Sequence, residues 1–316
     1  VESIAGRDLS DKIFCDLFAG TGIVGRNFKT KVKKVISNDF EYYSYVLNKN
    51  YIENHSQIEA GKALINELQE VQPISGFIFK NYSKGGQGER QYFSDENARK
   101  IDGIRLTIET WKKKGEIDDN TYYFLLASLL ESADKVANTA SIYGAYLKNL
   151  KKSAQKPLNL EGAYFELNDN THEVYNTDSN KLIKEIEGDI LYLDPPYNAR
   201  QYGANYHLLN TIALYDEFTP KGKTGLRTYN KSEYCSRNNA FKAFENLIEN
   251  AAFQYIFLSY NNEGLMSLEQ IEKSMSKYGS YQLASTDYQR FKADKTENRI
   301  HKANKTTEYL HILEKK

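Results

Sequence analysis

An apolar, strand-like run in this chain ends in the sequence LYLDPPYNARQY, at residues 191–202. Proline has no backbone N–H and cannot continue a β-ladder, so the two prolines after Asp194 predict a rigid corner at the end of a strand. The corner offers a carboxylate on Asp194, the carbonyl oxygen of Pro195 and the aromatic face of Tyr197. Because α/β proteins bind ligands at the carboxyl ends of their strands, we predict a functional site here.

These three groups suit a planar amino group attached to an aromatic ring. Such an amine is a poor nucleophile, because its lone pair is delocalised into the ring. Two acceptors for its N–H bonds would draw the nitrogen toward tetrahedral geometry, and a stacked aromatic ring would hold the base for in-line attack. The electrophile must then carry its own leaving group, as the methyl group of a sulfonium does. A plain proline turn is the alternative interpretation.

A second stretch, DLFAGTGIVG at residues 16–25, has the spacing G-x-G-x-x-G at Gly20, Gly22 and Gly25, and Asp39 follows. This pattern is also the fingerprint of a nicotinamide dinucleotide site, so a dehydrogenase is one alternative. The dehydrogenase interpretation assigns no function to the DPPY corner. S-adenosylmethionine also contains an adenosine and carries a sulfonium methyl group, so the two stretches together favour methyl transfer from this cofactor.

In this interpretation the glycine turn lets the backbone approach the methionine part of the cofactor. Asp39 would accept hydrogen bonds from the ribose hydroxyls. A helix N-cap is the alternative role for Asp39, because a helical run follows it.

Alternating strand and helix patterns predict a parallel α/β sheet that positions both stretches. Strands are expected at residues 12–18, 32–38, 171–177, 189–194 and 253–261, helices at 23–28, 41–55, 179–187 and 267–279, and a closing antiparallel pair at 281–291 and 306–315. Between them lies a region whose apolar residues follow helical spacing, at 64–71, 95–114 and 121–137.

We therefore predict a Rossmann-like, S-adenosylmethionine-dependent methyltransferase sheet with a mostly helical inserted domain. The catalytic domain would comprise residues 1–48 and 165–316, and the insert residues 49–164.

The overall composition excludes little. Lys plus Arg and Asp plus Glu both number 42, so the net charge is zero and any nucleic-acid partner must be recognised by local charge. The only cysteines, Cys15 and Cys235, favour a reducing compartment such as the bacterial cytoplasm over a disulfide framework. The sequence indicates no metal site, and its apolar runs are too short to cross a membrane.

The sequence resembles the adenine-N6 DNA methyltransferases of the Dam and FokI type. The matching stretches are DLFAGTG, SNDFEYYSYVLN, LYLDPPYNARQY and LSYNNEG, in that order, from residue 16 to about residue 264. The resemblance implies a catalytic corner formed by Asp194, Pro195, Pro196 and Tyr197. It also implies cofactor contacts from Asp16, Phe18, Ala19, Gly20, Thr21, Gly22 and Asp39, with Asp178 near the adenine of the cofactor.

The same family is expected to supply a cofactor-binding segment just upstream of the first strand, with a lysine near it. The residues that precede the first strand here, VESIAGRDLS, do not match that segment.

An enzyme that acts on a base in a duplex must flip the base out of the stack and read the surrounding sequence in a groove. The helical insert is the expected recognition domain, and two loops rich in glycine and basic residues, at 80–93 and 221–234, are further candidates. The predicted DNA contacts are Lys84, Arg90, Tyr92, Arg200, Gln201, Lys221, Lys223, Arg227 and Lys231. The basic stretch at 289–305 is another candidate for phosphate contact.

The resulting hypothesis is a site-specific adenine-N6 DNA methyltransferase of a restriction–modification system. Its expected partners are double-stranded DNA and a restriction endonuclease that acts on the same site. The alternatives are an RNA base methyltransferase, a cytosine-N4 methyltransferase and a catalytically silent DNA-binding subunit.

Overall fold

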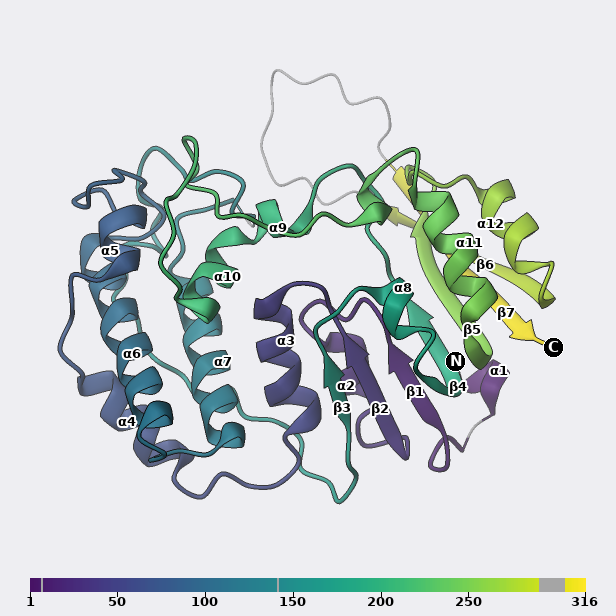
Figure 1. Cartoon of the computed structure of the whole chain (residues 1–316), viewed down its shortest axis with the longest axis horizontal. Coiled ribbons are helices and arrows are strands. Elements are labelled where there is room, and N and C mark those ends of the chain that lie inside the picture. The colour runs from purple at the N-terminus through teal and green to yellow at the C-terminus, as the bar shows by residue number, and fades with distance from the viewer. Residues whose placement is uncertain (7, 141, 290–304) are drawn as a thin grey trace. The chain divides into compact units, whose positions relative to one another are not determined.

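The computed structural model describes residues 1–6, 8–140, 142–289 and 305–316. These residues form two compact units (Figure 1). The first, here called the sheet unit, comprises Val1–Phe40, Asn170–Gln201 and Lys231–Lys316, and the second, the helical unit, comprises Glu41–Asp169 and Tyr202–Asn230. Residues 290–304, which hold most of the basic stretch predicted to contact phosphate, lie outside the described residues.

The strands described in the sheet unit form one seven-stranded sheet in the order β3-β2-β1-β4-β5-β7-β6. β1 to β5 pair in parallel, whereas β7 runs antiparallel to both β5 and β6. This arrangement confirms the predicted α/β fold class. The strand bounds are β1 (Ile13–Asp16), β2 (Lys34–Asn38), β3 (Glu173–Tyr175), β4 (Glu187–Leu193), β5 (Ala252–Asn261), β6 (Gly279–Gln289) and β7 (Lys305–Lys315).

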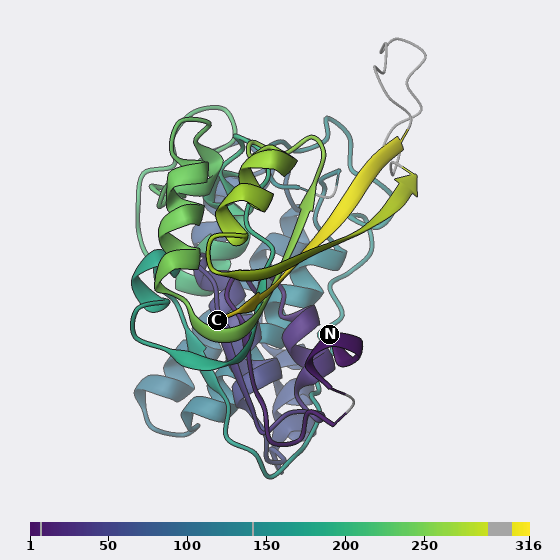
Figure 2. The same ribbon diagram turned by 90° about the vertical axis from the view of Figure 1, so that its right-hand side faces the viewer.

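Helices cover both faces of this sheet. On one face a buried apolar cluster joins the strands to α8 (Ser179–Leu182), α11 (Ala240–Asn250) and α12 (Leu268–Met275), and Figure 2 shows α11 and α12 along the same side. On the other face Phe28 of α2 (Ile23–Phe28) stacks on Phe14 of β1, with the ring centroids 4.1 Å apart. Consecutive β1 residues point to opposite faces, so this strand is buried on both sides.

Two short helices complete the sheet unit, α1 (Glu2–Ala5) and the 3-10 turn η2 (Glu233–Cys235). We did not predict α11 from the sequence, although its buried residues Phe244, Leu247 and Ile248 follow helical spacing. Among the described residues, no helix has both the length and the apolar character that spanning a membrane requires.

The helical unit is built around the long helices α6 (Asp95–Lys113) and α7 (Asp119–Lys135), each of which contributes many buried residues. Ser94 and Asp118 cap these helices by accepting hydrogen bonds from Asn97 N and Thr121 N. The predicted helix at 41–55 is interrupted, because it becomes a π-helix after Asn48 and ends at Glu53. The other bounds are α3 (Tyr42–Asn48), η1 (Lys49–Glu53), α4 (Gly61–Glu70), α5 (Phe77–Tyr82), α9 (Tyr202–Asn205) and α10 (His207–Leu214).

The boundaries of the helical unit differ from those that we predicted. It extends from Glu41 to Asp169 rather than over residues 49–164, and it takes in Tyr202–Asn230, which we had placed in the catalytic domain. The physical reason is α10, whose residues are nearly all buried against α3 and α7. Its Asn210 side chain accepts from Tyr43 N at 2.9 Å, which fixes α10 to the start of α3.

A buried aspartate organises part of the helical unit. Asp102 of α6 accepts hydrogen bonds from the backbone N–H groups of Gly76, Ile78 and Phe79, at 3.0, 2.9 and 2.8 Å, and also from the Tyr215 hydroxyl. The first turn of α5 has no intrahelical partners for these N–H groups, so a residue distant in the sequence caps it. The capping carboxylate ties α5 and the chain after α10 to α6.

We predict that Asp102→Ala lowers the free energy of unfolding of the helical unit by about 3 kcal/mol, because it removes the acceptor of the buried Ile78 N–H and of the half-buried Phe79 N–H. Trp111, the only tryptophan, lies on α6, so its fluorescence during urea unfolding reports on this unit. Asp119→Asn, at an exposed position, is the control and should change stability little. Equal stability of the two variants would contradict the role of Asp102.

Candidate active site

The DPPY corner follows directly after β4. Pro195 is buried and Pro196 is half-buried, so the turn is held by packing, while the Tyr197 side chain is 40% exposed. The Tyr197 carbonyl accepts a hydrogen bond of 3.1 Å from Leu265 N, in the loop after β5. The corner is therefore fixed at its backbone, and its aromatic ring is accessible to a ligand.

Solvent reaches the Asp194 side chain, yet protein atoms lie around much of it. This partial desolvation raises the pKa of Asp194 to about 6, and the negative charge of Glu308 on β7 adds to the rise. Asp194 is thus a carboxylate at neutral pH with a higher proton affinity than an ordinary aspartate, which makes it a strong hydrogen-bond acceptor.

The predicted glycine turn leads from β1 into α2. Gly20 and Gly22 have φ of 53° and 77°, in the left-handed region that favours glycine. A side chain built on Gly20 would meet no atom within 4 Å, so there is open space above the turn. The Gly20 N–H donates to Asp39 Oδ2 at 2.8 Å, which links the turn to the end of β2.

Asp16, the last residue of β1, is buried at 1% exposure. Burial raises its pKa to about 7; the Gly25 N–H, which donates to Oδ2 at 3.2 Å, opposes this rise, and the charges of Asp194 and Asp39 add to it. The other oxygen, Oδ1, has no hydrogen-bond partner among the described residues. The glycine turn and the DPPY corner lie at one edge of the sheet because β1 and β4 pair in parallel, and the Asp39 and Asp194 charges there act on Asp16.

The structure contradicts the helix N-cap alternative for Asp39. The helix that follows has Glu41 at its N-cap position, while Asp39 accepts from Gly20, so Asp39 is not that helix's cap. Asp178, in contrast, caps α8 by accepting from Lys181 N at 3.1 Å. Of the remaining turn residues, Phe18 packs edge-on against Tyr234 with centroids 5.0 Å apart, Ala19 is buried and Thr21 is exposed.

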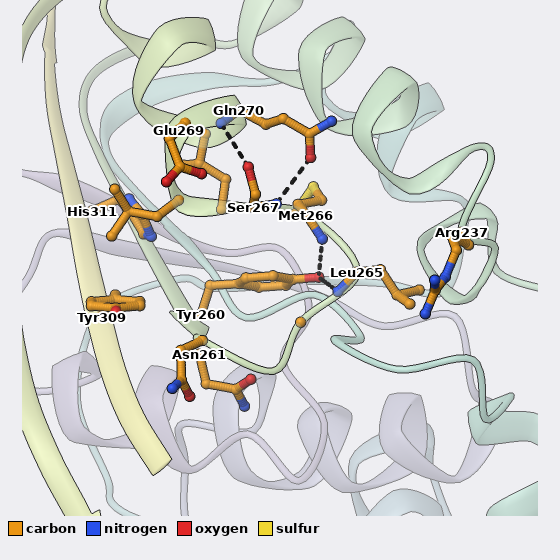
Figure 3. A pocket seen from close by; sticks show the side chains of 14 residues that line it. Arg237, Tyr260, Asn261, Leu265, Met266, Ser267, Glu269, Gln270, Tyr309 and His311 are labelled. Atoms are coloured by element: carbon orange, nitrogen blue, oxygen red, sulfur yellow. Dashed lines mark hydrogen bonds between the residues drawn. The ribbon is translucent and has the colours of Figure 1, made fainter.

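Tyr260, at the end of β5, is a residue to which the sequence analysis assigned no role. Its hydroxyl accepts from Leu265 N at 3.0 Å and from Met266 N at 3.4 Å (Figure 3). Leu265 N also donates to the Tyr197 carbonyl. Tyr260 therefore positions the loop after β5, which in turn contacts the DPPY corner. The resemblance of the stretch LSYNNEG was a signal for this residue, but the contact with the corner becomes visible only in the fold.

The same loop borders a cavity of about 450 Å³. Its lining includes Tyr260, Tyr309, Arg237 and His311 (Figure 3). His311 is fully buried, and burial lowers its pKa to about 4, so the imidazole is neutral at neutral pH. One of its ring nitrogens contacts the Tyr281 hydroxyl at 2.9 Å.

Tyr92 is a correction to the predicted DNA contacts. Its side chain is fully buried in the helical unit, where its hydroxyl donates to the carbonyls of Tyr143 and Thr224. A buried ring cannot stack on a base, so Tyr92 is a core residue.

Three other predicted contacts have side chains that are engaged within the protein. Arg227 forms two parallel hydrogen bonds with Asp216, at 2.9 and 2.8 Å. Gln201 exchanges hydrogen bonds with the backbone of Ser232 in both directions, and Arg90 donates to three backbone carbonyls. The remaining predicted contacts, Lys84, Arg200, Lys221, Lys223 and Lys231, are exposed.

A glycine turn and a DPPY corner at one edge of an α/β sheet define the class of methyltransferases that act on exocyclic amines of bases. The chain belongs to the D12 class of N6 adenine-specific DNA methyltransferases, whose family profile matches residues 2–274. This assignment favours adenine in DNA over the RNA and cytosine alternatives.

Several type II methyltransferases are similar over most of this chain. M.NlaIII of Neisseria lactamica is 65% identical over 315 residues, which cover 100% of this chain and 94% of the relative. M.CviAII of Paramecium bursaria Chlorella virus 1 is 39% identical, over 89% of this chain and 84% of the relative. M.FokI of Planomicrobium okeanokoites is 42% identical over 96% of this chain, which spans only 48% of that relative.

The raised pKa of Asp194 predicts an acid limit to activity. Only the carboxylate can accept hydrogen bonds with both oxygens, so single-turnover methyl transfer should fall about tenfold per pH unit below pH 6. Because the charge of Glu308 raises this pKa, Glu308→Gln should move the midpoint to lower pH. An unshifted midpoint would assign the limit to another group, such as Asp16.

Loss of the Tyr260 hydroxyl should loosen the catalytic corner. We expect Tyr260→Phe to slow methyl transfer about tenfold, the cost of one hydrogen bond, while DNA and cofactor affinities stay unchanged. The control is Tyr255→Phe on the same strand, whose hydroxyl accepts only an exposed hydrogen bond from Gln254 among those described. Equal rates for the two variants would exclude the positioning role.

Proposed function

We propose that this methyltransferase modifies the N6 amine of an adenine flipped out of a specific site in double-stranded DNA, with S-adenosylmethionine as the methyl donor. The observation that carries the proposal is the pairing of β1 with β4, in which Asp16 lies beside Tyr192. Parallel pairing brings the turn after β1 and the corner after β4 to one edge, within reach of a single bound cofactor and base.

On the base side, the Asp194 carboxylate and the Pro195 carbonyl would accept the two N–H bonds of the amine, and Tyr197 would stack on the ring. Localising the lone pair on nitrogen makes the amine nucleophilic. The bond from sulfur to the methyl group would break as the bond to nitrogen forms. As the nitrogen gains positive charge during transfer, the adjacent carboxylate would stabilise that charge, and the surplus proton on nitrogen would then pass to Asp194 or to water. The raised proton affinity of Asp194 supports this role.

On the cofactor side, S-adenosylmethionine would supply an electrophilic methyl group on a positively charged sulfur. The turn formed by Phe18, Ala19, Gly20, Thr21 and Gly22 would admit it closely, and Asp39 would hold the ribose. The unpartnered Oδ1 of Asp16 and the open space above Gly20 fit a polar ligand at this edge. The carboxylates there also favour a cation over the neutral product that remains after transfer. Asp178 would lie near the adenine of the cofactor.

On the DNA side, the helical unit would carry target recognition, and Lys84, Arg200, Lys221, Lys223 and Lys231 would contact the substrate. Their exposure supports this proposal. The relatives are named type II methyltransferases, which supports a role for this chain as the modification enzyme of a restriction–modification system. It would act in the bacterial cytoplasm and protect DNA from an endonuclease with the same site.

The direct test is to incubate the chain with S-adenosylmethionine and unmethylated DNA and to analyse the nucleosides by mass spectrometry. N6-methyladenine in duplex DNA is the expected product. Methylation only in total RNA, tested in parallel, or on cytosine N4 would contradict the proposal. Sequencing the methylated positions would then identify the recognition site.

Asp194→Ala should reduce methyl transfer by about 1,000-fold or more, because the amine loses its charged acceptor, while DNA binding is retained. Glu187→Gln, an exposed change at the opposite end of β4, is the matched control and should keep full activity. Tyr197→Ala should lower turnover more than cofactor affinity. Normal turnover by Asp194→Ala would refute the assigned mechanism.

A further inference from the structure

A tight hairpin at residues 221–226 of the helical unit is held by hydrogen bonds from side chains of the same unit. Lys221 and Leu226 exchange backbone hydrogen bonds of 2.8 Å in both directions and so enclose a four-residue turn. Gly222 and Gly225, at the two ends of that turn, have φ of +67° and +72°. Glycine therefore permits a turn that other residues would adopt only with strain.

Four consecutive carbonyls of this turn, those of residues 222–225, accept hydrogen bonds from side chains of the same unit. Arg90 donates to the first two at 3.2 and 3.3 Å, Tyr92 to the third at 3.2 Å and Tyr82 to the fourth at 2.7 Å. Arg90 also donates to the Asn81 carbonyl at 3.2 Å. Because both tyrosines are fully buried, these hydrogen bonds join the turn directly to the core of the unit.

The exposed part of the hairpin carries positive charge. Lys221 and Lys223 are exposed, and neither forms a salt bridge with any residue that the structure describes. The nearby arginines differ, since Arg90 is occupied by carbonyls and Arg227 is paired with Asp216 and lies over the Phe218 ring. The hairpin thus presents the ammonium groups of Lys221 and Lys223, whereas the nearby guanidinium groups of Arg90 and Arg227 are engaged in hydrogen bonds within the protein.

We propose that this hairpin grips the phosphate backbone of DNA through Lys221 and Lys223 and does not read bases. Base reading relies on planar groups that make paired hydrogen bonds, whereas lysines act as point charges suited to phosphates. Arg90 is then a positioning residue that preorganises the hairpin and lowers the cost of ordering it on binding. This inference rests on the proposed function only in taking duplex DNA as the substrate.

The first test removes the charges. Lys221→Gln with Lys223→Gln should weaken binding to a cognate and to an unrelated duplex by the same factor, about tenfold. The slope of log K against log salt should fall in magnitude by about 1.8. Lys113→Gln with Lys114→Gln, also exposed lysines of the helical unit, is the control for loss of charge. An unchanged slope, or a loss confined to the cognate duplex, would overturn the proposal.

The second test separates positioning by Arg90 from direct DNA contact. Arg90→Lys keeps the charge but cannot reach two carbonyls with a planar fork. We expect several-fold weaker DNA binding, an unchanged salt slope and faster tryptic cleavage after Lys221 and Lys223. Wild-type affinity in Arg90→Lys, together with a slope reduced by about 0.9 in Arg90→Gln, would instead make Arg90 a phosphate contact.

Alanine substitutions at Gly222 and Gly225 test the Arg90 contacts without altering any charge. A Cβ on Gly225 would lie 2.8 Å from Arg90 Cδ and 2.9 Å from the Tyr82 ring, whereas one on Gly222 would meet nothing within 4 Å. Both alanine variants carry the cost of a positive φ, so only Gly225→Ala should add the loss of the Arg90 contacts and weaken DNA binding further. Equal affinities for the two variants would count against the Arg90 anchor.

Failure of this proposal can be distinguished from failure of the proposed function. If the wild-type chain makes no N6-methyladenine in duplex DNA, the proposed function is wrong and the hairpin loses its substrate. If methylation occurs and the lysine and Arg90 variants bind DNA as the wild type does, only the hairpin proposal is wrong. Trp111 fluorescence in urea verifies that each variant is folded.

Discussion

The parallel pairing of β1 with β2 and β4 is the constraint on which the site depends. Parallel strands run in the same direction, so the carboxyl ends of β1, β2 and β4 lie at one edge of the sheet. The chain therefore leaves the sheet three times at that edge. Glycines with positive φ make the turn after β1, two prolines make the turn after β4, and Asp39 follows β2. The hydrogen bond from Gly20 N to Asp39 then joins two of these turns directly.

The same edge concentrates negative charge. Burial, together with the charges of Asp194 and Asp39, raises the pKa of Asp16 to about 7, and burial with the charge of Glu308 raises that of Asp194 to about 6. Keeping carboxylates together in a partly desolvated place has a cost in stability, which a structural role alone does not explain. A cationic methyl donor and an amine that develops positive charge would both offset that cost.

The helical unit uses charged side chains for a different purpose. Asp102 caps α5 from another helix, and Arg90 holds the carbonyls of a distant turn. Arg105 donates to the carbonyls of Ile212 and Ala213 at the end of α10. In each case a charged side chain satisfies backbone groups that secondary structure leaves unpaired. Irregular segments thereby become rigid, which is what a surface that must fit a DNA duplex requires.

The sequence by itself determined the fold class, most of the strand and helix alternation and the position of the DPPY corner, because DPPY and FAGTG are local patterns with local geometric causes. It also led to the family, through four stretches that keep their order along the chain. Only the tertiary structure decided that Tyr202–Asn230 belongs to the helical unit, that Tyr260 supports Tyr197 and that Tyr92 is buried. It also decided that the side chains of Arg90 and Arg227 are engaged within the protein. Arg90 donates to carbonyls 132 and 133 positions away, and Arg227 pairs with Asp216 eleven positions away across a loop, and neither separation follows a helix or strand period.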